Sequence, residues 1–419
     1  SGHKCLFPPV NSLSRRSIRA VGNRRLSVSE VVRDPMFDTS TGACNNLGAM
    51  RAVLNKIVIN ILFILVLALS ALASDWDRGV SLYNKGDYRT ALAEFQDIVR
   101  ERPDAAGAWY YIGLCEFKMK RYKRVELPLS HAIDLLEVQA SDSADIAGAW
   151  YTIGISHYLL NNYEKAVDPL KRYLDLTAKA KREIDPGARA ALGRSYFFLE
   201  RYDEAVPLLS SPKAAGEKAK DGNTGSAYYL GAIYFKREDD DRAIAALREA
   251  VAAAPEDTAS LDLLAESLLR KASKTNGAAA ASVWTEAAQA GEKLRAVRDD
   301  LKTANILGRA YLGARQFDKA VAPLEKLAKA NTENGQAWLY YGLALSRSGQ
   351  LRKAMEALEI SIQLMPDSIT ALSELGYVYE SDKQYQQALR IYEKAFAATN
   401  DSAIKGSLER VRLLASQQP

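Results

Sequence analysis

The most restrictive feature of this sequence is a short apolar phrase that recurs along the chain. AGAWYYIG at residues 106–113 and AGAWYTIG at residues 147–154 differ at one letter in eight. Related phrases end in a small residue, and these small residues, named here the ladder residues, are Gly79, Gly113, Gly154, Gly193, Gly231, Ala265, Gly308, Gly342 and Gly376. Their spacing is 34 to 43 residues, and 34 occurs four times. A recurring period of this size predicts stacked repeats rather than a few separate globular domains.

Each repeat carries the pattern of two helices. Nine residues after the ladder residue comes an aromatic or aliphatic side chain, three later a small residue and four later a large one, as in Tyr88, Ala91 and Phe95. Apolar residues three and four positions apart give the first helix one apolar stripe, and the small residue lets a second helix approach it closely. A helical hairpin of this kind cannot bury its stripe alone, so neighbouring repeats must stack on it.

These features resemble the tetratricopeptide repeat family, over roughly residues 73–400 and in nine units. The resemblance implies an all-α fold, a right-handed α-solenoid of stacked helix-turn-helix repeats. We expect five repeats in residues 74–257, a degenerate repeat that could act as a hinge in residues 258–300, three repeats in residues 301–400 and a capping helix in residues 401–419. In the degenerate repeat, an alanine-rich stretch replaces the usual turn, and we expect the second helix over Ser282–Leu294.

The N-terminal region reads as a targeting segment. Met50, Arg51 and Lys56 precede an apolar run from Ile57 to Ala73 that ends in Ala-Leu-Ala, which predicts a signal peptide over residues 50–73 with cleavage after Ala73. The alternative is an uncleaved N-terminal anchor, because 17 residues lie near the lower limit for spanning a bilayer. Residues 1–49 are interpreted as a non-native or misassigned upstream segment, with an organelle transit peptide as the alternative.

Composition argues against several classes of chemistry. The first 73 residues hold nine basic and three acidic residues, so their positive charge exceeds the whole chain's formal net charge of +5. The remaining residues are therefore close to neutral, and nucleic acid is not expected as a partner. Cys115 is the only cysteine after Ala73, and His131 and His157 are the only histidines there, too few for a zinc site without carboxylates. No glycine-rich phosphate loop occurs. We therefore predict no catalytic, cofactor-binding or metal-binding residues, and interpret the acidic run 238–241 as a solvated turn that caps the next helix.

The remaining candidate is a protein-binding surface. In the resembled family, first helices line a concave face, and this implies as binding residues Trp76, Val80, Tyr110, Leu114, Tyr151, Ile155, Arg194 and Tyr228. Among these, Trp76, Tyr110, Tyr151 and Tyr228 are expected to be exposed, since such aromatic side chains supply much of the energy of interfaces. The later repeats place more polar residues on the same face, namely Asp262, Glu266, Asn305, Arg309, Leu339, Leu343, Ser373, Tyr377 and Glu380.

We therefore expect a non-enzymatic protein–protein interaction scaffold or adaptor of the bacterial cell envelope, which binds a peptide or protein on its concave face. The expected location is the periplasm or the medium, or the inner membrane if residues 57–73 remain attached. The alternative is a membrane-anchored accessory subunit of an export, polysaccharide or envelope-assembly machine. An enzyme is the least favoured interpretation, because no convergent set of reactive side chains is visible.

Overall fold

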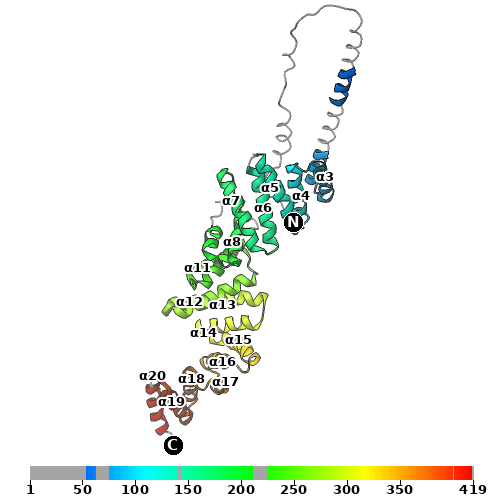
Figure 1. Ribbon diagram of the computed structural model, residues 1–419. Coiled ribbons are helices and arrows are strands. Elements are labelled where there is room, and N and C mark those ends of the chain that lie inside the picture. The colour runs from blue at the N-terminus through cyan, green and yellow to red at the C-terminus, as the bar shows by residue number, and fades with distance from the viewer. Residues whose placement is uncertain (1–52, 63–74, 140–142, 211–223, 400, 418–419) are drawn as a thin grey trace, which may run out of the picture. The chain divides into compact units, whose positions relative to one another are not determined.

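The computed structural model describes residues 53–62, 75–139, 143–210, 224–399 and 401–417 (Figure 1). Within these ranges the secondary structure is helical and contains no strand. The first helices of the repeats are residues 75–84, α4 (Ala106–Lys118), α6 (Ser143–Leu159), α8 (Pro186–Phe198), α10 (Thr224–Lys236), α12 (Thr258–Lys274), α14 (Leu301–Gly313), α16 (Gly335–Arg347) and α18 (Ile369–Ser381). The predicted all-α solenoid of helical hairpins is confirmed.

The second helices alternate with the first along the chain, and the first helices α4, α6, α10, α12, α14, α16 and α18 each contact the second helix that follows them. They are α3 (Tyr88–Glu101), α5 (Glu126–Val138), α7 (Tyr163–Lys179), α9 (Tyr202–Leu209), α11 (Asp240–Ala253), α13 (Gly277–Val297), α15 (Phe317–Ala330), α17 (Leu351–Leu364) and α19 (Tyr385–Thr399). A short 3-10 turn, η1 (Tyr122–Arg124), leads into α5, and α20 (Ser402–Ser416) follows the last repeat.

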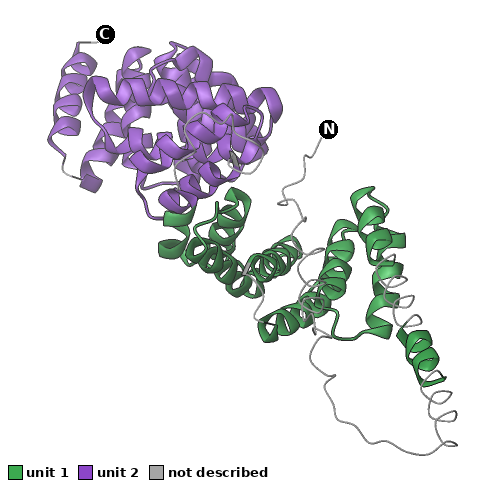
Figure 2. Ribbon diagram, turned by 90° about the horizontal axis from the view of Figure 1, so that it is seen from above, with its two compact units in different colours: residues 1–208 green, residues 209–419 purple. Residues whose placement is uncertain are grey.

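The chain divides into two compact units, Ser1–Leu208 and Leu209–Pro419, drawn in green and purple in Figure 2. Unit 1 has a buried core that includes Phe95, Tyr111 and Leu129. In unit 2, one core runs from α11 to α18 and includes buried residues of α12, α13 and α14. Residues 258–300 therefore share the core of the repeats on either side, and a hinge there stays a prediction.

The two helices of a repeat cross at the ladder residue. A Cβ atom built on Gly342 would lie 2.6 Å from Cγ of Leu358, and one built on Gly231 would lie 2.5 Å from Cγ of Leu247. Both distances are far shorter than van der Waals contact between carbon atoms. The same close approach recurs in other repeats, between Gly79 and Phe95, Gly113 and Leu129, Gly154 and Leu170, Gly308 and Leu324, and Gly376 and Tyr392. The ladder glycines thus provide the space for the large residue 16 positions later.

First helices end through a residue in the left-handed conformation. Seven residues after the ladder residue, φ lies between 55° and 85° at Gly86, Lys120, Asn161, Glu200, Glu238, Arg315, Gly349 and Lys383. After α4, the N–H of Arg121 donates to the carbonyl of Glu116 and the N–H of Lys120 to that of Phe117, both at 2.9 Å. This Schellman arrangement satisfies the last carbonyl groups of the helix and turns the chain toward the second helix.

The degenerate repeat departs from this plan. Its left-handed residue is Gly277, with φ of 68°, at the start of α13. The second helix therefore begins five residues before the predicted Ser282 and ends at Val297. Its close approach is to the next repeat, because a Cβ built on Gly291 would lie 2.8 Å from Cδ2 of Leu307. The alanine-rich stretch was expected to take the place of a turn, but it forms the start of α13, because alanine is the strongest helix former.

The two ends of the described chain differ. At the C-terminus, α20 buries Ile404, Leu408 and Val411 and packs against α19. At the N-terminus, residues 53–62 form a helix whose side chains are all exposed, including Ile59 and Leu62. In the part of the chain that the structure describes, no helix has both the length and the apolar character needed to cross a bilayer. Most of the apolar run Ile57–Ala73 lies outside the described residues.

Candidate functional site

The first helices of consecutive repeats contact one another within each unit. In unit 1, α4 contacts α6 and α6 contacts α8, and in unit 2 the series runs from α10 through α12, α14 and α16 to α18. The surface that these helices present is named here the first-helix face. The residues predicted to bind a partner occupy two places on it, three residues before the ladder residue and one residue after it.

In unit 1, the aromatic side chains three residues before the ladder residue lie between repeats. A Cβ built on Gly107 would lie 2.7 Å from Cη2 of Trp76, and one built on Gly148 would lie 2.5 Å from the hydroxyl oxygen of Tyr110. Each ring therefore covers a glycine in the first helix of the next repeat. Tyr110 is 7% exposed and Leu114 is 2% exposed. The prediction that Tyr110 is an exposed contact is wrong, because Gly148 lets the neighbouring repeat pack closely over its ring. Leu114 is buried too and is not part of the surface.

The other predicted residues of unit 1 are half-buried, namely Trp76, Val80, Tyr151, Ile155 and Arg194. The ring of Tyr151 meets the ring of Tyr173 edge-on, with 5.1 Å between centroids. Burial raises the pKa of Tyr151, and the nearby carboxylate of Asp185 raises it further. Arg194 Nη1 donates to the hydroxyl of Tyr158 at 3.5 Å, a long hydrogen bond. Trp76 and Tyr110 thus contact the next repeat, whereas the contact of Tyr151 with Tyr173 joins the two helices of one repeat. Tyr228, which belongs to unit 2, is half-buried against Tyr229.

In unit 2, ion pairs take the place of these aromatic contacts. Asp262 is 9% exposed and accepts hydrogen bonds from Arg298 Nη2 at 2.7 Å and Lys302 Nζ at 3.3 Å. Lys302 also reaches Glu266 at 2.9 Å. Asp262 and Glu266 are predicted to face a ligand, but Arg298 at the end of the same repeat pairs with Asp262, and Lys302 of the following repeat pairs with both carboxylates. Arg298 could not be predicted as a partner of Asp262, because it lies just before α14 and outside the repeated phrase.

Two more interfaces of unit 2 contain ion pairs. Arg347 Nη2 donates to Glu374 at 2.8 Å, and the hydroxyl of Ser346 donates to the same carboxylate at 2.6 Å. Arg410 on α20 donates to both carboxylate oxygens of Glu380, at 2.7 and 3.0 Å. Glu380, another predicted face residue, is therefore held by the last helix.

Several predicted residues of unit 2 remain open to solvent. Tyr377 is 40% exposed, and the guanidinium carbon of Arg347 lies 4.7 Å from the centroid of its ring. Half-buried residues on this face are Asn305, Arg309, Leu343 and Ser373. Leu339 is 3% exposed and belongs to the core. Unit 2 therefore offers the more accessible part of the predicted surface.

Side chains that could carry chemistry have structural partners. Cys115 is fully buried, and burial raises the pKa of its thiol to about 12, which leaves it protonated at neutral pH. His157 is 7% exposed with Nε2 3.3 Å from Glu126, and burial lowers its pKa although Glu126 opposes the shift. Within the described residues, no group of three or more metal-binding side chains comes together.

The acidic turn before α11 is only partly solvated. Asp239 accepts from the N–H of Arg242 at 3.1 Å and caps α11, as predicted. Asp240 is 9% exposed and binds Arg270 Nε at 2.5 Å and Lys274 Nζ at 3.2 Å. The expected solvated turn is therefore a contact between repeats at Asp240, because α12 places two cations beside it.

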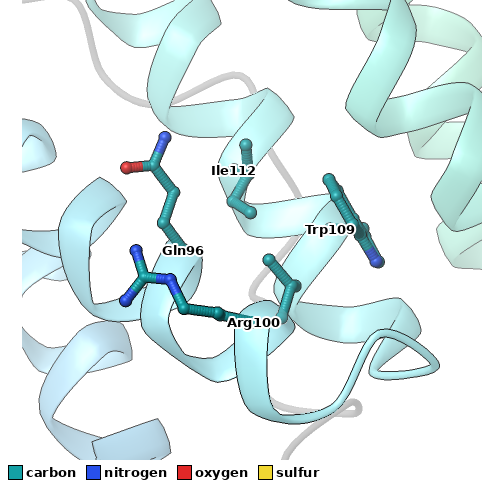
Figure 3. Close-up of a pocket in the computed structure, with 5 residues that line it drawn as sticks. Gln96, Arg100, Trp109 and Ile112 are labelled. Carbon is teal, nitrogen blue, oxygen red and sulfur yellow. The ribbon is translucent and has the colours of Figure 1, made fainter.

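An open depression of about 390 Å³ lies between α3 and α4 of unit 1 (Figure 3). Gln96 and Arg100 come from α3, and Trp109 and Ile112 from α4. Arg100 pairs with Asp97, and the indole N–H of Trp109 donates to the carbonyl of Pro103 at 2.8 Å. The polar groups of the lining are therefore one cation and one amide.

Comparisons with known proteins agree with this geometry. Two family models, both described as tetratricopeptide repeat, match the sequence, one over residues 77–124, 190–258 and 307–369 and the other over residues 371–403. A search of curated protein sequences gave no significant match.

Similar solved structures are of proteins shorter than this chain. MamA shares 23% identity over 43% of this chain and 93% of its own, with a TM-score of 0.37. MamA from Desulfovibrio magneticus RS-1 shares 19% sequence identity over 44% of this chain and 99% of its own chain, with a TM-score of 0.37. YrrB, described as a TPR protein with an unusual peptide-binding site, shares 18% sequence identity over 45% of this chain and 91% of its own chain, with a TM-score of 0.39.

Proposed function

We propose that this chain, which belongs to the tetratricopeptide repeat family, is a non-enzymatic protein–protein interaction scaffold that binds a partner on its first-helix face. The family is typically a non-catalytic interaction fold, and stacked repeats of this kind present extended binding surfaces. The finer parts of the proposal are the face that binds and the location of the protein.

The observation that carries the proposal is the run of first helices that contact one another in series. In unit 2, five first helices from α10 to α18 form this series. Half-buried or exposed side chains, namely Arg309, Leu343 and Tyr377, lie along it, each one residue after the ladder residue of its repeat. A row of side chains at equal intervals matches a ligand that is itself extended, and a peptide is such a ligand.

The reactive residues of the chain support a binding role rather than catalysis. The Cys115 thiol is buried and protonated, and the His157 ring packs against Glu126. The buried carboxylates Asp240, Asp262 and Glu374 are each neutralised by a cation of a neighbouring helix. Groups that are committed to contacts between helices cannot take up a substrate without breaking those contacts.

We further propose a place in the bacterial cell envelope, reached through residues 50–73 as a signal peptide. Basic residues before the apolar run and the Ala-Leu-Ala ending support this location. The exposed apolar side chains of residues 53–62 fit the same role, since an exposed apolar helix requires an apolar environment. If this segment stays attached, the protein is instead a membrane-anchored accessory subunit of an export, polysaccharide or envelope-assembly machine.

Photo-crosslinking of the full chain, in the cells that naturally express it, tests the binding face. A benzophenone amino acid is placed at Val80 or Tyr377 on the first-helix face and, as a matched control, at Arg352 on the exposed side of α17. We expect a crosslinked partner protein from the two face positions and none from Arg352. Crosslinks that form only from Arg352 would refute the assignment of the face. Membrane fractionation of the same cells separates a cleaved periplasmic protein from an anchored one.

A further inference from the structure

One turn of unit 1 carries an uninterrupted basic run. Residues 118–124, named here the basic turn, read KMKRYKR and contain no acid. They cover the end of α4, the left-handed residue Lys120 and η1. The cations of the basic turn are Lys118, Lys120, Arg121, Lys123 and Arg124. The seven residues at the same place of each other repeat have a net charge between −2 and +3, so the second repeat has the highest positive charge at this turn.

Most of these cations are not used to hold the repeats together. Lys120, Lys123 and Arg124 are exposed and have no ion pair within the described residues. Arg121 lies 3.6 Å from Glu116, a separation longer than a hydrogen bond. In the degenerate repeat of unit 2, by contrast, the three cations at this place all pair with acids of the turn before α11, namely Arg270, Lys271 and Lys274.

The basic turn also disturbs the start of the second helix. In the other repeats of regular plan, the second α-helix begins nine residues after the ladder residue, as at Tyr163, but here η1 takes that place and α5 begins at Glu126. Lys123 lies where other repeats carry acids such as Asp203 and Asp318. Acids stabilise the N-terminus of a helix and cations destabilise it, because this end carries a partial positive charge. The cations are therefore unfavourable for the fold, and a bound anion would relieve their repulsion.

Exposed aliphatic side chains lie beside the basic turn. Leu127, in the first turn of α5, is 80% exposed. Its neighbour Glu126 lies 3.3 Å from Nε2 of His157, so the start of α5 lies against the end of α6. Leu159, two residues beyond His157, is 46% exposed. The same edge of unit 1 thus presents both positive charge and apolar surface.

We propose that residues 118–127 bind the surface of a bilayer that contains anionic phospholipid. The cations contact the phosphate groups of the lipid, and Leu127 enters the apolar region beneath them. A nucleic acid has the same charge, but it stacks its bases on exposed aromatic rings and has no use for an exposed leucine. Tyr122, the aromatic residue of the basic turn, is half-buried with its ring edge-on to Phe117, at 5.6 Å between centroids. This inference goes beyond the proposed scaffold function and does not involve the first-helix face.

Flotation of the full chain with lipid vesicles tests the proposal. One kind of vesicle is phosphatidylcholine alone, and the other is an equal mixture with phosphatidylglycerol. The measured quantity is the ratio of the lipid concentrations that give half-maximal binding, because any insertion of the uncharged residues 57–73 contributes equally to both and cancels. We expect the anionic vesicles to be bound about 100-fold more tightly, which corresponds to about 1 kcal/mol for each of the three exposed cations.

The double variant Lys123→Gln/Arg124→Gln is expected to reduce this preference about 30-fold. The matched control is Arg352→Gln/Lys353→Gln, which removes the same charge at the same two places of a repeat in unit 2. Arg352 and Lys353 are likewise exposed and have no ion pair in the part of the chain that the structure describes. We expect the control to keep the preference. An equal loss in both double variants would show a general effect of net charge and overturn the proposal.

Leu127→Ser separates a bilayer from other anions. It should weaken binding to the anionic vesicles about tenfold, because the leucine no longer enters the bilayer, and leave binding of a single-stranded oligonucleotide unchanged. An oligonucleotide that binds more tightly than the vesicles and depends on Lys123 and Arg124 would assign the basic turn to nucleic acid instead. An unaltered chain without preference for the anionic vesicles overturns the proposal as well. In each case, crosslinking from Tyr377 in unit 2 still reports on the scaffold function.

Discussion

Replacing Gly342 by alanine tests the packing rule of the repeats. The added Cβ would lie 2.6 Å from Cγ and 2.7 Å from Cδ2 of Leu358, and 3.4 Å from its backbone nitrogen. Leu358 is fully buried, so it cannot rotate away without displacing other core residues. Overpacking of this kind costs about 1–3 kcal/mol. The gain in helix propensity from glycine to alanine offsets about 1 kcal/mol, which leaves a net loss of up to about 2 kcal/mol.

Gly406→Ala is the matched control in the same unit. Gly406 lies within α20, is exposed, and has no heavy atom within 4 Å of a built Cβ. The change in helix propensity is therefore not opposed, and we expect a gain of about 1 kcal/mol. The difference between the two variants, about 1–3 kcal/mol, is the cost of the contact with Leu358 alone.

Urea denaturation followed by circular dichroism measures both variants, and hydrogen exchange of α16 and α17 locates the loss. A second substitution, Leu358→Val, should reduce the effect of Gly342→Ala, because the shorter side chain leaves room for the methyl group. If Gly342→Ala stabilises the protein as much as Gly406→Ala does, the reasoning about close approach is wrong.

Two further predictions concern tyrosines. Tyr110→Ala is expected to lower the stability of unit 1 by about 3 kcal/mol, because it leaves a cavity over Gly148. Tyr377→Ala, at an exposed site, should cost about 0.5 kcal/mol. Urea denaturation of the two variants measures the difference. Burial and the hydrogen bond to Glu292 raise the pKa of Tyr311 to about 12. A tyrosine in the unfolded chain ionises at about pH 10. The contribution of Tyr311 to the free energy of unfolding is therefore fully present below about pH 10 and is lost as the pH rises through 12. Tyr311→Phe should therefore lose less stability between about pH 9 and pH 11 than the unaltered chain, and equal losses would contradict this assignment.

The repeated phrase was sufficient to predict the fold because it encodes contacts within a repeat. Gly342 and Leu358 are 16 residues apart, and their sizes are complementary in the sequence itself. The turn that ends each first helix was harder to predict from the sequence. Gly86, Gly349 and Asn161 have residue types that favour the left-handed conformation, whereas residues such as Lys120 and Glu238 adopt it under the constraint of the two packed helices.

The candidate site was predicted less well because exposure depends on the next repeat. Tyr110 has the residue type of an interface contact, and its burial is decided by Gly148, 38 residues later. The repeated phrase contained that signal, since Gly107 and Gly148 are the second letters of AGAWYYIG and AGAWYTIG. The cation Arg298 could not be predicted in the same way, because it is the C-cap residue of α13 and lies outside the repeated phrase, and the residue types at the corresponding C-caps, such as Ala254 and Asn331, differ.

The contacts between repeats also bear on how such a chain can change over evolution. Repeats multiply by duplication, yet here one interface depends on an aromatic ring over glycine, at Tyr110 and Gly148, and another on a buried carboxylate with two cations, at Asp262. Deleting the repeat between two unlike interfaces would bring an aromatic ring against a charge, or leave a carboxylate buried without its cation, at a cost of several kcal/mol. The chemistry of the contacts therefore fixes the order of these repeats, although most of them share one backbone plan, and selection is expected to remove recombinants among them.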